Sequence, residues 1–154
     1  MSPAPGVVTI YLASFKGTHS GWRGLLNRFI RWATAGAYSH TEVTVGNPFT
    51  GPVLCVSSVG TDGGVRGKRM QLSPDEFDLA ELPGVTERQV LDFLAEHQGQ
   101  GYDLVGTLLT VLPFAGREHP SRWICSEVAA HLAGLMDPWR FHPTALHCVL
   151  KGKA

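Results

Sequence analysis

The stretch YSHTEVTV, residues 38–45, decides the fold class, because the residues from His40 onward alternate in character. In a β-strand successive side chains point to opposite faces of the sheet. Val43 and Val45 therefore share one face, whereas His40 and Glu42 share the other. We expect a strand whose valines pack in the core and whose His40 points away from the core face.

A second strand is predicted at 53–59, directly after a run of turn-forming residues at 46–52. Its apolar residues alternate with Cys55 and Ser57, which lie on the opposite face. If the apolar residues of both strands share one core, then Cys55 and Ser57 share a surface with His40. This pairing predicts a polar face beside the histidine.

Periodicity outside the two strands predicts one more strand and several helices. A capping box at 86–89 marks one helix start, and Pro113 ends another helix. The segment 22–33 places arginines between apolar residues at helical spacing, which indicates an amphipathic helix. The strand is expected at 7–12, and the helices at 22–33, 87–98, 104–112 and 123–135. No repeat or linker is visible, so residues 1–154 are expected to form a single α+β domain.

Composition excludes several functional classes. The chain has 154 residues, of which 44% are hydrophobic and 17% charged, and its 13 basic residues balance its 13 acidic ones. This is neither a disordered composition nor a strongly basic one, so nucleic acid is not an expected partner. The longest uncharged run, 104–116, contains Pro113 and falls short of the roughly 20 apolar residues of a membrane-spanning helix. We therefore expect no transmembrane segment.

The N-terminal residues and the cysteines bear on the cellular compartment. No basic residue precedes Lys16, and no cleavage site follows a long apolar stretch, so a secretory signal is not indicated. The three cysteines include no C-x-x-C pair, which fits reduced thiols better than disulfides or a zinc knuckle. The expected location is the cytoplasm where the chain is made, with virion association or export without a signal peptide as further options.

Cys125 and His40 are the candidate reactive pair. Cys125 falls in the first turn of the helix predicted at 123–135, where free N–H groups and the helix dipole stabilise a thiolate. A cysteine nucleophile needs a base, and His40 is the histidine whose strand directs it off the core. The alternative is a buried structural cysteine and an ordinary surface histidine.

Two further motifs carry no function. The run Gly63 to Lys68 resembles a phosphate-binding loop, but Asp62 takes its leading position and Arg69 replaces the magnesium-binding hydroxyl residue. We interpret the basic cluster Arg66, Lys68 and Arg69 as a solvated turn. The C-terminal group His142, His147 and Cys148 lacks a second ligand pair with recognisable spacing. No metal ion or cofactor is expected.

Three segments together resemble a known family. They are Tyr38-Ser39-His40-Thr41-Glu42-Val43, then Cys55-Val56-Ser57-Ser58 leading to Asp62-Gly63-Gly64-Val65-Arg66, and finally Trp123-Ile124-Cys125-Ser126-Glu127. In this order they resemble the permuted branch of the NlpC-like, papain-fold cysteine hydrolases, particularly the short forms met in phages and prophages. The run Gly101-Tyr102-Asp103 with Gly106 is similar to the Tyr-Asp segment of that branch.

The resemblance implies a circularly permuted papain-like (NlpC-like) fold, with an antiparallel sheet or small barrel packed against helices. It also implies that Cys125 is the nucleophile and His40 the general base and later the acid. Ser57 takes the third position, which orients the imidazole, and Cys55 is its reserve. Glu42 is a second reserve orienter or a substrate contact, and Tyr102 is a candidate oxyanion donor beside the Cys125 N–H.

Three functions follow as hypotheses. The leading one is a cysteine amidase or peptidase that forms an acyl-enzyme, with peptidoglycan stem peptides as substrate because the wider family is rich in cell-wall hydrolases. The second keeps the thiol and acts on a lipid ester or thioester, as a hydrolase or acyltransferase. The third is a non-catalytic structural or binding protein of a phage particle, in which the Cys-His pair persists without turnover.

Overall fold

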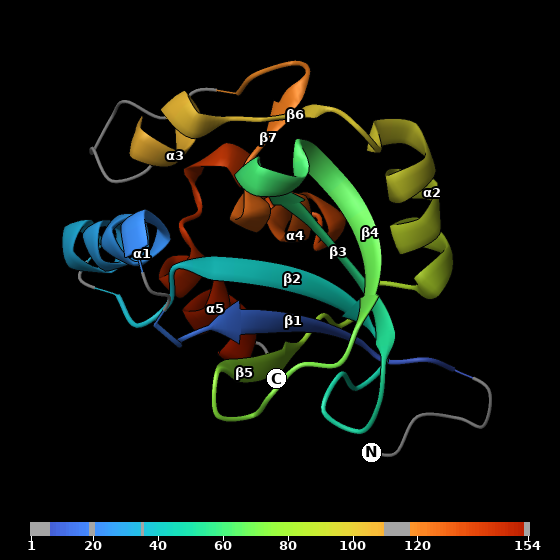
Figure 1. Ribbon diagram of the computed structural model, residues 1–154. Helices are drawn as coiled ribbons and strands as arrows, with labels where there is room; N and C mark the ends of the chain where they lie inside the picture. Colours follow the sequence, from blue (N-terminus) through green and yellow to red (C-terminus); the bar gives the residue numbers. More distant parts are fainter. Residues whose placement is uncertain (1–6, 19–20, 35, 110–117, 153–154) are drawn as a thin grey trace.

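The computed structural model describes residues 7–18, 21–34, 36–109 and 118–152. They form a mixed α+β arrangement around a five-stranded antiparallel sheet (Figure 1). The strands are β1 (Ile10–Phe15), β2 (His40–Val45), β3 (Val53–Val59), β4 (Gly64–Met70) and β5 (Phe77–Glu81), in the order β4-β3-β2-β1-β5. The predicted α+β class is therefore confirmed.

Helices and a small second sheet complete the described part. The helices are α1 (Gly21–Ala33), α2 (Glu87–His97), α3 (Leu104–Leu109), α4 (Cys125–Leu132) and α5 (Pro143–Lys151). Short 3-10 turns occur at η1 (Gly60–Asp62) and η2 (Pro138–Arg140), and β6 (Gly101–Tyr102) pairs in parallel with β7 (Arg122–Trp123). No helix in the described ranges is long and apolar enough to cross a membrane.

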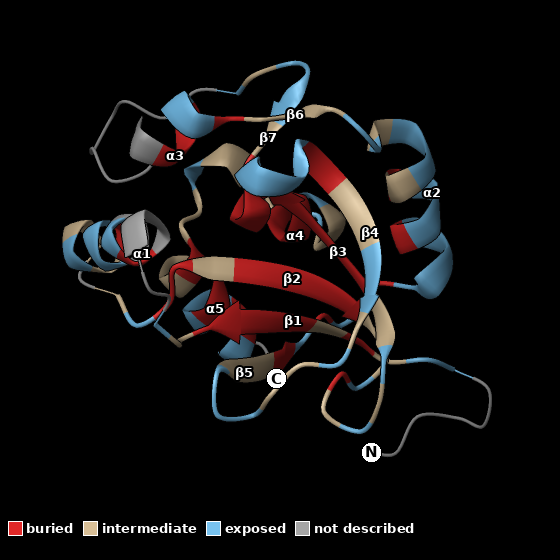
Figure 2. Cartoon of the chain, in the orientation of Figure 1, coloured by how far each residue is buried: buried red, intermediate tan, exposed pale blue. Residues whose placement is uncertain are grey.

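The main core lies between the sheet and two helices. Helix α4 packs against β2 and β3, and α5 packs against β1 and β5, so both lie behind the sheet in Figure 1. Helix α2 contacts β4 at one side. The buried aliphatic side chains of this layer include Ile10, Leu12, Val43, Val56, Val128, Leu146 and Leu150, and Figure 2 shows the central strands and α4 as mostly buried. Each contributes roughly 1.5–3 kcal/mol through burial.

The alternation predicted for β2 and β3 is confirmed. Both strands have the predicted bounds, and Val43 pairs with Val56 in the buried core. The opposite face is also buried, because the sheet curls and β4 passes in front of β2 and β3 (Figure 1). Glu42 is only 3% exposed and Ser57 is fully buried. The polar face beside His40 therefore lies inside the curl of the sheet.

Several predicted boundaries shift. The first strand runs from Ile10 to Phe15 rather than over 7–12. Helix α2 begins after the N-cap Thr86, as predicted, and Gly99 takes a positive φ of 84° just beyond its end. Helix α4 is shorter than the predicted 123–135, because 122–123 joins β7 instead. The predicted helix at 104–112 is observed as α3 to Leu109, and its last residues lie outside the described part.

The interpretation of the basic cluster as a solvated turn is wrong. Arg66, Lys68 and Arg69 lie on β4, which pairs along its whole length with β3. Lys68 and Arg69 are exposed, but the Arg66 side chain is only 15% exposed. The sequence of β4 is mostly polar and glycine-rich, so it lacks the apolar alternation that indicates a strand.

Candidate active site

Cys125 is held at the N-terminal end of α4 by the segment that precedes it. The Ser58 hydroxyl donates to the Trp123 carbonyl oxygen (2.7 Å), which ties β7 to the end of β3. The Asp103 N–H donates to the same oxygen (3.0 Å). Because α4 begins at Cys125, the N–H groups of its first turn have no acceptor within the helix. The sulfur, on a residue that is 7% exposed, therefore sits at the positive end of the helix dipole.

A buried carboxyl group closes the same helix end. Glu127 accepts a hydrogen bond from the Ile124 N–H (3.2 Å), which satisfies the donor just before Cys125. Burial raises the pKa of Glu127 to about 7, against the lowering effect of that hydrogen bond. Glu127 therefore satisfies the Ile124 N–H, whereas the N–H groups of the first turn of α4 have no acceptor within the helix.

The imidazole of His40 lies between the thiol and a carboxylate. Its Nε2 lies 2.8 Å from Glu42 Oε1, and the ring is near enough to Cys125 for each group to shift the pKa of the other. Because Glu42 takes Nε2, Nδ1 is the ring nitrogen left for the sulfur. His40 and Glu42 are two residues apart on β2, so their side chains project from the same face of the strand. The side chain of His40 is 26% exposed, which leaves the ring accessible at one edge.

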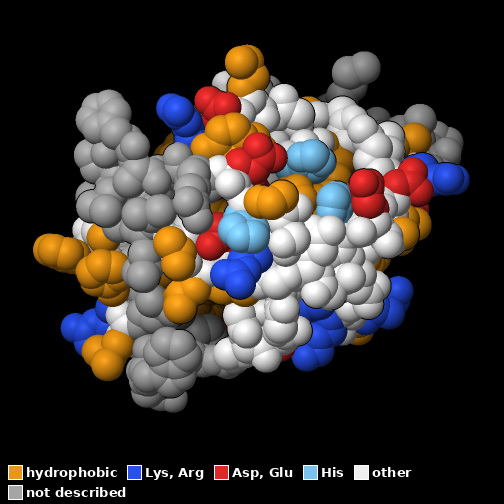
Figure 3. All heavy atoms as spheres, turned by 90° about the horizontal axis from the view of Figure 1, so that it is seen from above, with side chains coloured by type: hydrophobic (Ala, Val, Ile, Leu, Met, Phe, Trp, Pro, Cys, Tyr) orange, Lys and Arg blue, Asp and Glu red, His pale blue; other side chains and the backbone are white. Residues whose placement is uncertain are grey.

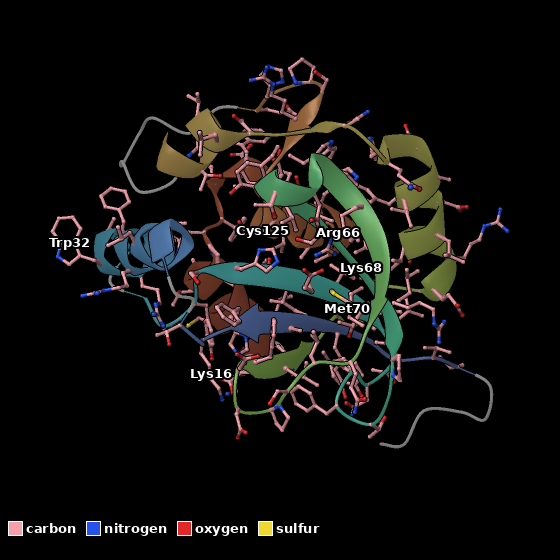
Figure 4. All side chains as sticks on the ribbon, in the orientation of Figure 1. Lys16, Trp32, Arg66, Lys68, Met70 and Cys125 are labelled. Carbon is pink, nitrogen blue, oxygen red and sulfur yellow. The ribbon has the colours of Figure 1, made fainter. Side chains whose placement is uncertain are left out.

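Glu42 is fixed in turn by Arg66. The two guanidinium nitrogens Nη1 and Nη2 bind the two carboxylate oxygens at 2.7 and 2.6 Å. Arg66 also donates through Nε to Asp62 (2.9 Å). Figure 4 shows Cys125 near the end of β2, with Arg66 approaching from β4. The site is therefore a row of alternating charges, Cys125, His40, Glu42, Arg66 and Asp62, when the first two exist as an ion pair.

The pKa values of the pair shift in opposite directions. Burial favours the neutral thiol, but the charge of the nearby His40 imidazolium outweighs it and lowers the pKa of Cys125. Burial also opposes the charged imidazole, yet Cys125 and Glu42 outweigh it and raise the pKa of His40. Burial raises the pKa of Glu42, but the hydrogen bonds and charges of His40 and Arg66 outweigh burial and lower it. The geometry favours a thiolate–imidazolium pair.

Ser57 does not occupy the expected third position. Its hydroxyl donates to the Thr41 carbonyl oxygen (2.7 Å), and no hydrogen bond joins it to His40 among the described residues. The strand register explains the difference. Ser57 pairs with Arg66, and continuing the β2–β3 register places it opposite Glu42 rather than His40. Its small side chain leaves the space through which Arg66 reaches Glu42.

Cys55, the reserve for that position, is also remote from the imidazole. Its sulfur faces the carbonyl oxygens of Val53 (3.7 Å) and Met70 (3.9 Å). Burial raises the pKa of Cys55 to about 12, and the charge of Glu42 acts in the same direction. Cys55 is therefore a protonated, buried thiol, and Glu42 is the residue that contacts His40.

Tyr102, the candidate second oxyanion donor, lies within electrostatic range of Cys125. Its ring packs against Gly60, and its hydroxyl oxygen accepts from the Thr107 hydroxyl (2.9 Å). Burial raises the pKa of Tyr102, and the Cys125 charge raises it further, which keeps the phenol protonated. Gly64, at the start of β4, lets the backbone just before β6 come close, because a Cβ at Gly64 would collide with the Gln100 carbonyl oxygen.

Arg66, the cation that holds Glu42, was not predicted from the sequence as a site residue. The available signal was the turn at 60–64 between the two halves of a hairpin, because the hairpin register places Arg66 beside Ser57. No group of three or more His, Cys, Asp or Glu side chains in the described ranges is arranged to hold a metal ion. Comparisons with family models, curated proteins and solved structures found no match to this chain.

Proposed function

We propose that this protein is a cysteine hydrolase in which Cys125 is the nucleophile, His40 the general base and acid, and Glu42 the residue that orients the imidazole. The observation that carries the proposal is the proximity of the Cys125 thiol at the N-terminus of α4 to the His40 imidazole, with the pKa values of both groups shifted toward the ion pair. A lowered thiol pKa beside a base and a helix terminus is the usual environment of a reactive cysteine.

The geometry supports an acyl-enzyme mechanism. The Cys125 thiolate attacks an acyl carbon and forms a C–S bond. The acyl C–N or C–O bond then breaks, and the His40 imidazolium gives its proton to the leaving amine or alkoxide. His40 then takes a proton from water, which attacks the thioester and releases the acid. The Cys125 N–H and the Tyr102 hydroxyl are the proposed donors to the oxyanion. Glu42 stabilises the imidazolium, and in the neutral imidazole it favours the tautomer with the proton on Nε2.

We further propose that the fold is the circularly permuted papain-like arrangement. Its support is the chain order, in which the strand with His40 precedes the helix with Cys125, together with an antiparallel sheet that packs against that helix. Peptidoglycan stem peptides are the favoured substrates, on the resemblance of the motifs around His40 and Cys125 to cell-wall hydrolases.

A lipid ester or thioester is the second candidate substrate. The observation that favours it is the exposure of large apolar side chains on α1, the helix that leads toward β2 and His40. A non-catalytic role in a phage particle remains the contrasting class, because the site geometry alone does not require turnover.

A substrate panel with mass spectrometry tests the reaction class. Protein is incubated in parallel with peptidoglycan stem peptides and with lipid esters, and the tryptic peptide containing Cys125 is examined after rapid acid quenching. We expect hydrolysis of one class and a transient acyl adduct on Cys125, since a thioester precedes its release. Absence of turnover on both classes, with no adduct on Cys125, would favour the non-catalytic hypothesis.

Thiol alkylation tests the ion pair without any substrate. In a Cys148→Ser background, which removes the exposed thiol, iodoacetamide at about pH 6 is expected to modify Cys125 in the folded protein. His40→Ala removes the positive charge, so burial dominates and the pKa of Cys125 rises. Alkylation of that variant at about pH 6 is expected to fall by roughly a hundredfold and to recover as the pH approaches about 9.

Cys55→Ala in the same background is the matched control, because Cys55 is buried and its raised pKa keeps it protonated. Its removal is expected to leave the alkylation rate unchanged. A Cys125 that reacts only after denaturation, or equally well with and without His40, would contradict the proposed ion pair.

A further inference from the structure

Helix α1 exposes the apolar side chains that an amphipathic helix normally buries. Leu25 is 66% exposed, Phe29 42% and Trp32 79%. Their spacing of four and three residues places them along one ridge of the helix. Ile30, on a different side of the helix, is only 7% exposed. Helices on protein surfaces usually turn the apolar stripe inward. Here the described part of that stripe faces away from the body of the protein.

The helix is attached to the protein through a different side, which carries Arg31 and the buried Ile30. Arg31, in the last turn of α1, donates through Nη1 to the Lys16 carbonyl oxygen (2.9 Å). Figure 4 shows Trp32 at the outer end of α1, pointing away from the sheet. The Phe29 and Trp32 rings lie 6.1 Å apart, so they form a continuous aromatic surface. Anchoring on that side leaves the ridge of Leu25, Phe29 and Trp32 exposed to solvent.

The charged residues of α1 are all basic. The helix contains Arg23, Arg28 and Arg31 and no acidic residue, whereas the whole chain has equal numbers of acidic and basic residues. Arg28 is exposed and lies next to Phe29 in the helix. Apolar and aromatic residues accompanied by arginines are characteristic of helices that lie in the headgroup region of a bilayer. The charge complements anionic lipid rather than a basic or neutral surface.

A second apolar surface lies at the same end of the molecule. Leu104 and Val105 of α3 are 50% and 54% exposed. Figure 1 draws α1 and α3 at the same side, and Figure 3 shows hydrophobic side chains gathered along that side. Helix α1 leads toward His40 at the start of β2, and α3 follows Tyr102. Both apolar surfaces therefore belong to helices that adjoin, in the chain, segments carrying candidate site residues.

We propose that the exposed ridge of α1 (Leu25, Phe29 and Trp32) docks this protein on the surface of a bilayer that contains anionic phospholipid. The exposed Arg28 binds a phosphate group, while the ridge inserts among the headgroups and upper acyl chains. A single ridge of three side chains is narrow for a second copy of the chain, since a stable dimer buries about 800 Å² on each partner. Docking in this orientation turns the His40 end of the sheet toward the membrane.

Vesicle flotation of the full chain tests the proposal. Protein is mixed with phosphatidylcholine vesicles with or without phosphatidylglycerol, and the floated fraction is measured. We expect binding to the anionic vesicles and at least about tenfold weaker binding to the neutral ones. The triple variant Leu25→Ser, Phe29→Ser, Trp32→Ser is expected to weaken anionic binding by at least about tenfold. Arg28→Glu is expected to weaken it in the same direction.

Matched controls separate docking from general hydrophobicity and from catalysis. Leu91→Ser on α2 and Met136→Ser change exposed apolar residues elsewhere and are expected to leave binding unchanged. Cys125→Ala is expected to bind as wild type, so a failed hydrolase proposal and a failed docking proposal give different results. Trp32→Ser alone replaces a largely exposed side chain, so it tests the ridge even if the triple variant folds poorly.

Three outcomes would overturn the docking proposal. The first is wild-type protein that does not float with anionic vesicles. The second is Trp32→Ser protein that binds them as tightly as wild type. The third is a wild-type dimer in size-exclusion chromatography that Trp32→Ser converts to monomer, which would assign the ridge to a second copy of the chain.

Discussion

Replacement of Cys125 by alanine is expected to lower hydrolysis of the accepted substrate by at least about a thousandfold, because the variant cannot form the acyl-enzyme. The other groups of the site remain in place, so only the nucleophile is removed. The measurement is the initial rate on the substrate class found in the panel, together with mass spectrometry of the Cys125-containing peptide. Substrate binding is expected to change far less than the rate, since the thiol is a small part of the contact surface.

Cys148→Ala is the matched control, because this cysteine is exposed and lies on α5. It is expected to retain full activity. Hydrolysis by Cys125→Ala at a rate comparable to wild type would show that another group carries the reaction, and would remove the basis for assigning His40 as its base.

Replacement of Arg66 by methionine is expected to lower the free energy of unfolding by roughly 3 kcal/mol, because it leaves the Glu42 carboxylate buried with one fewer partner. Glu42 is only 3% exposed and receives two of its hydrogen bonds from the Arg66 guanidinium. Methionine has a similar length and fills part of the same space, so the loss reflects charge pairing more than volume. Urea denaturation followed by circular dichroism provides the measurement.

Arg69→Met is the matched control, since Arg69 is on the same strand but exposed, and donates only to the Pro52 carbonyl oxygen at 3.0 Å in the described part. It is expected to change stability by less than about 0.5 kcal/mol. The double variant Glu42→Gln, Arg66→Met is expected to recover part of the loss, because a neutral amide needs no counter-charge. Equal effects of Arg66→Met and Arg69→Met would contradict a stabilising ion pair.

The pH dependence of the Arg66→Met effect has a defined sign. The pKa of Glu42 is lowered in the folded protein, so its ionised form contributes stability above the unfolded pKa of about 4.5. That contribution is lost as the pH falls through the lowered folded value. The stability difference between wild type and Arg66→Met is therefore expected to narrow in acid.

Local pattern was sufficient for the parts of the fold that rest on one segment. Alternation over 40–45 and over 54–57 predicts both strands and the buried faces of Val43 and Val56, because side-chain direction in a strand depends only on parity. The capping residue Thr86 likewise marks a helix start through a contact within one turn. The first-turn position of Cys125 was predicted in the same way.

Alternation along single strands could not show that Glu42, rather than Ser57, contacts the His40 imidazole, because that depends on how neighbouring strands are aligned. Parity places His40, Glu42 and Ser57 on one face but does not say which of them are adjacent across strands. The β2–β3 register sets Ser57 beside Glu42, and the hairpin register then brings Arg66 across it. A polar strand such as β4 gives little sequence signal, so the cation that holds Glu42 was found only from the structure.

The separation of His40 and Cys125 in the chain has a consequence for when the thiol becomes reactive. Their contact exists only after α4 has packed against β2, which joins segments from opposite ends of the sequence. In an unfolded chain the Cys125 thiol has neither neighbour and regains a pKa of about 8.5, so it is mostly protonated at neutral pH. In the proposed mechanism, tertiary assembly thus activates the sulfur toward electrophiles, and local opening of α4 would return it to the protonated thiol.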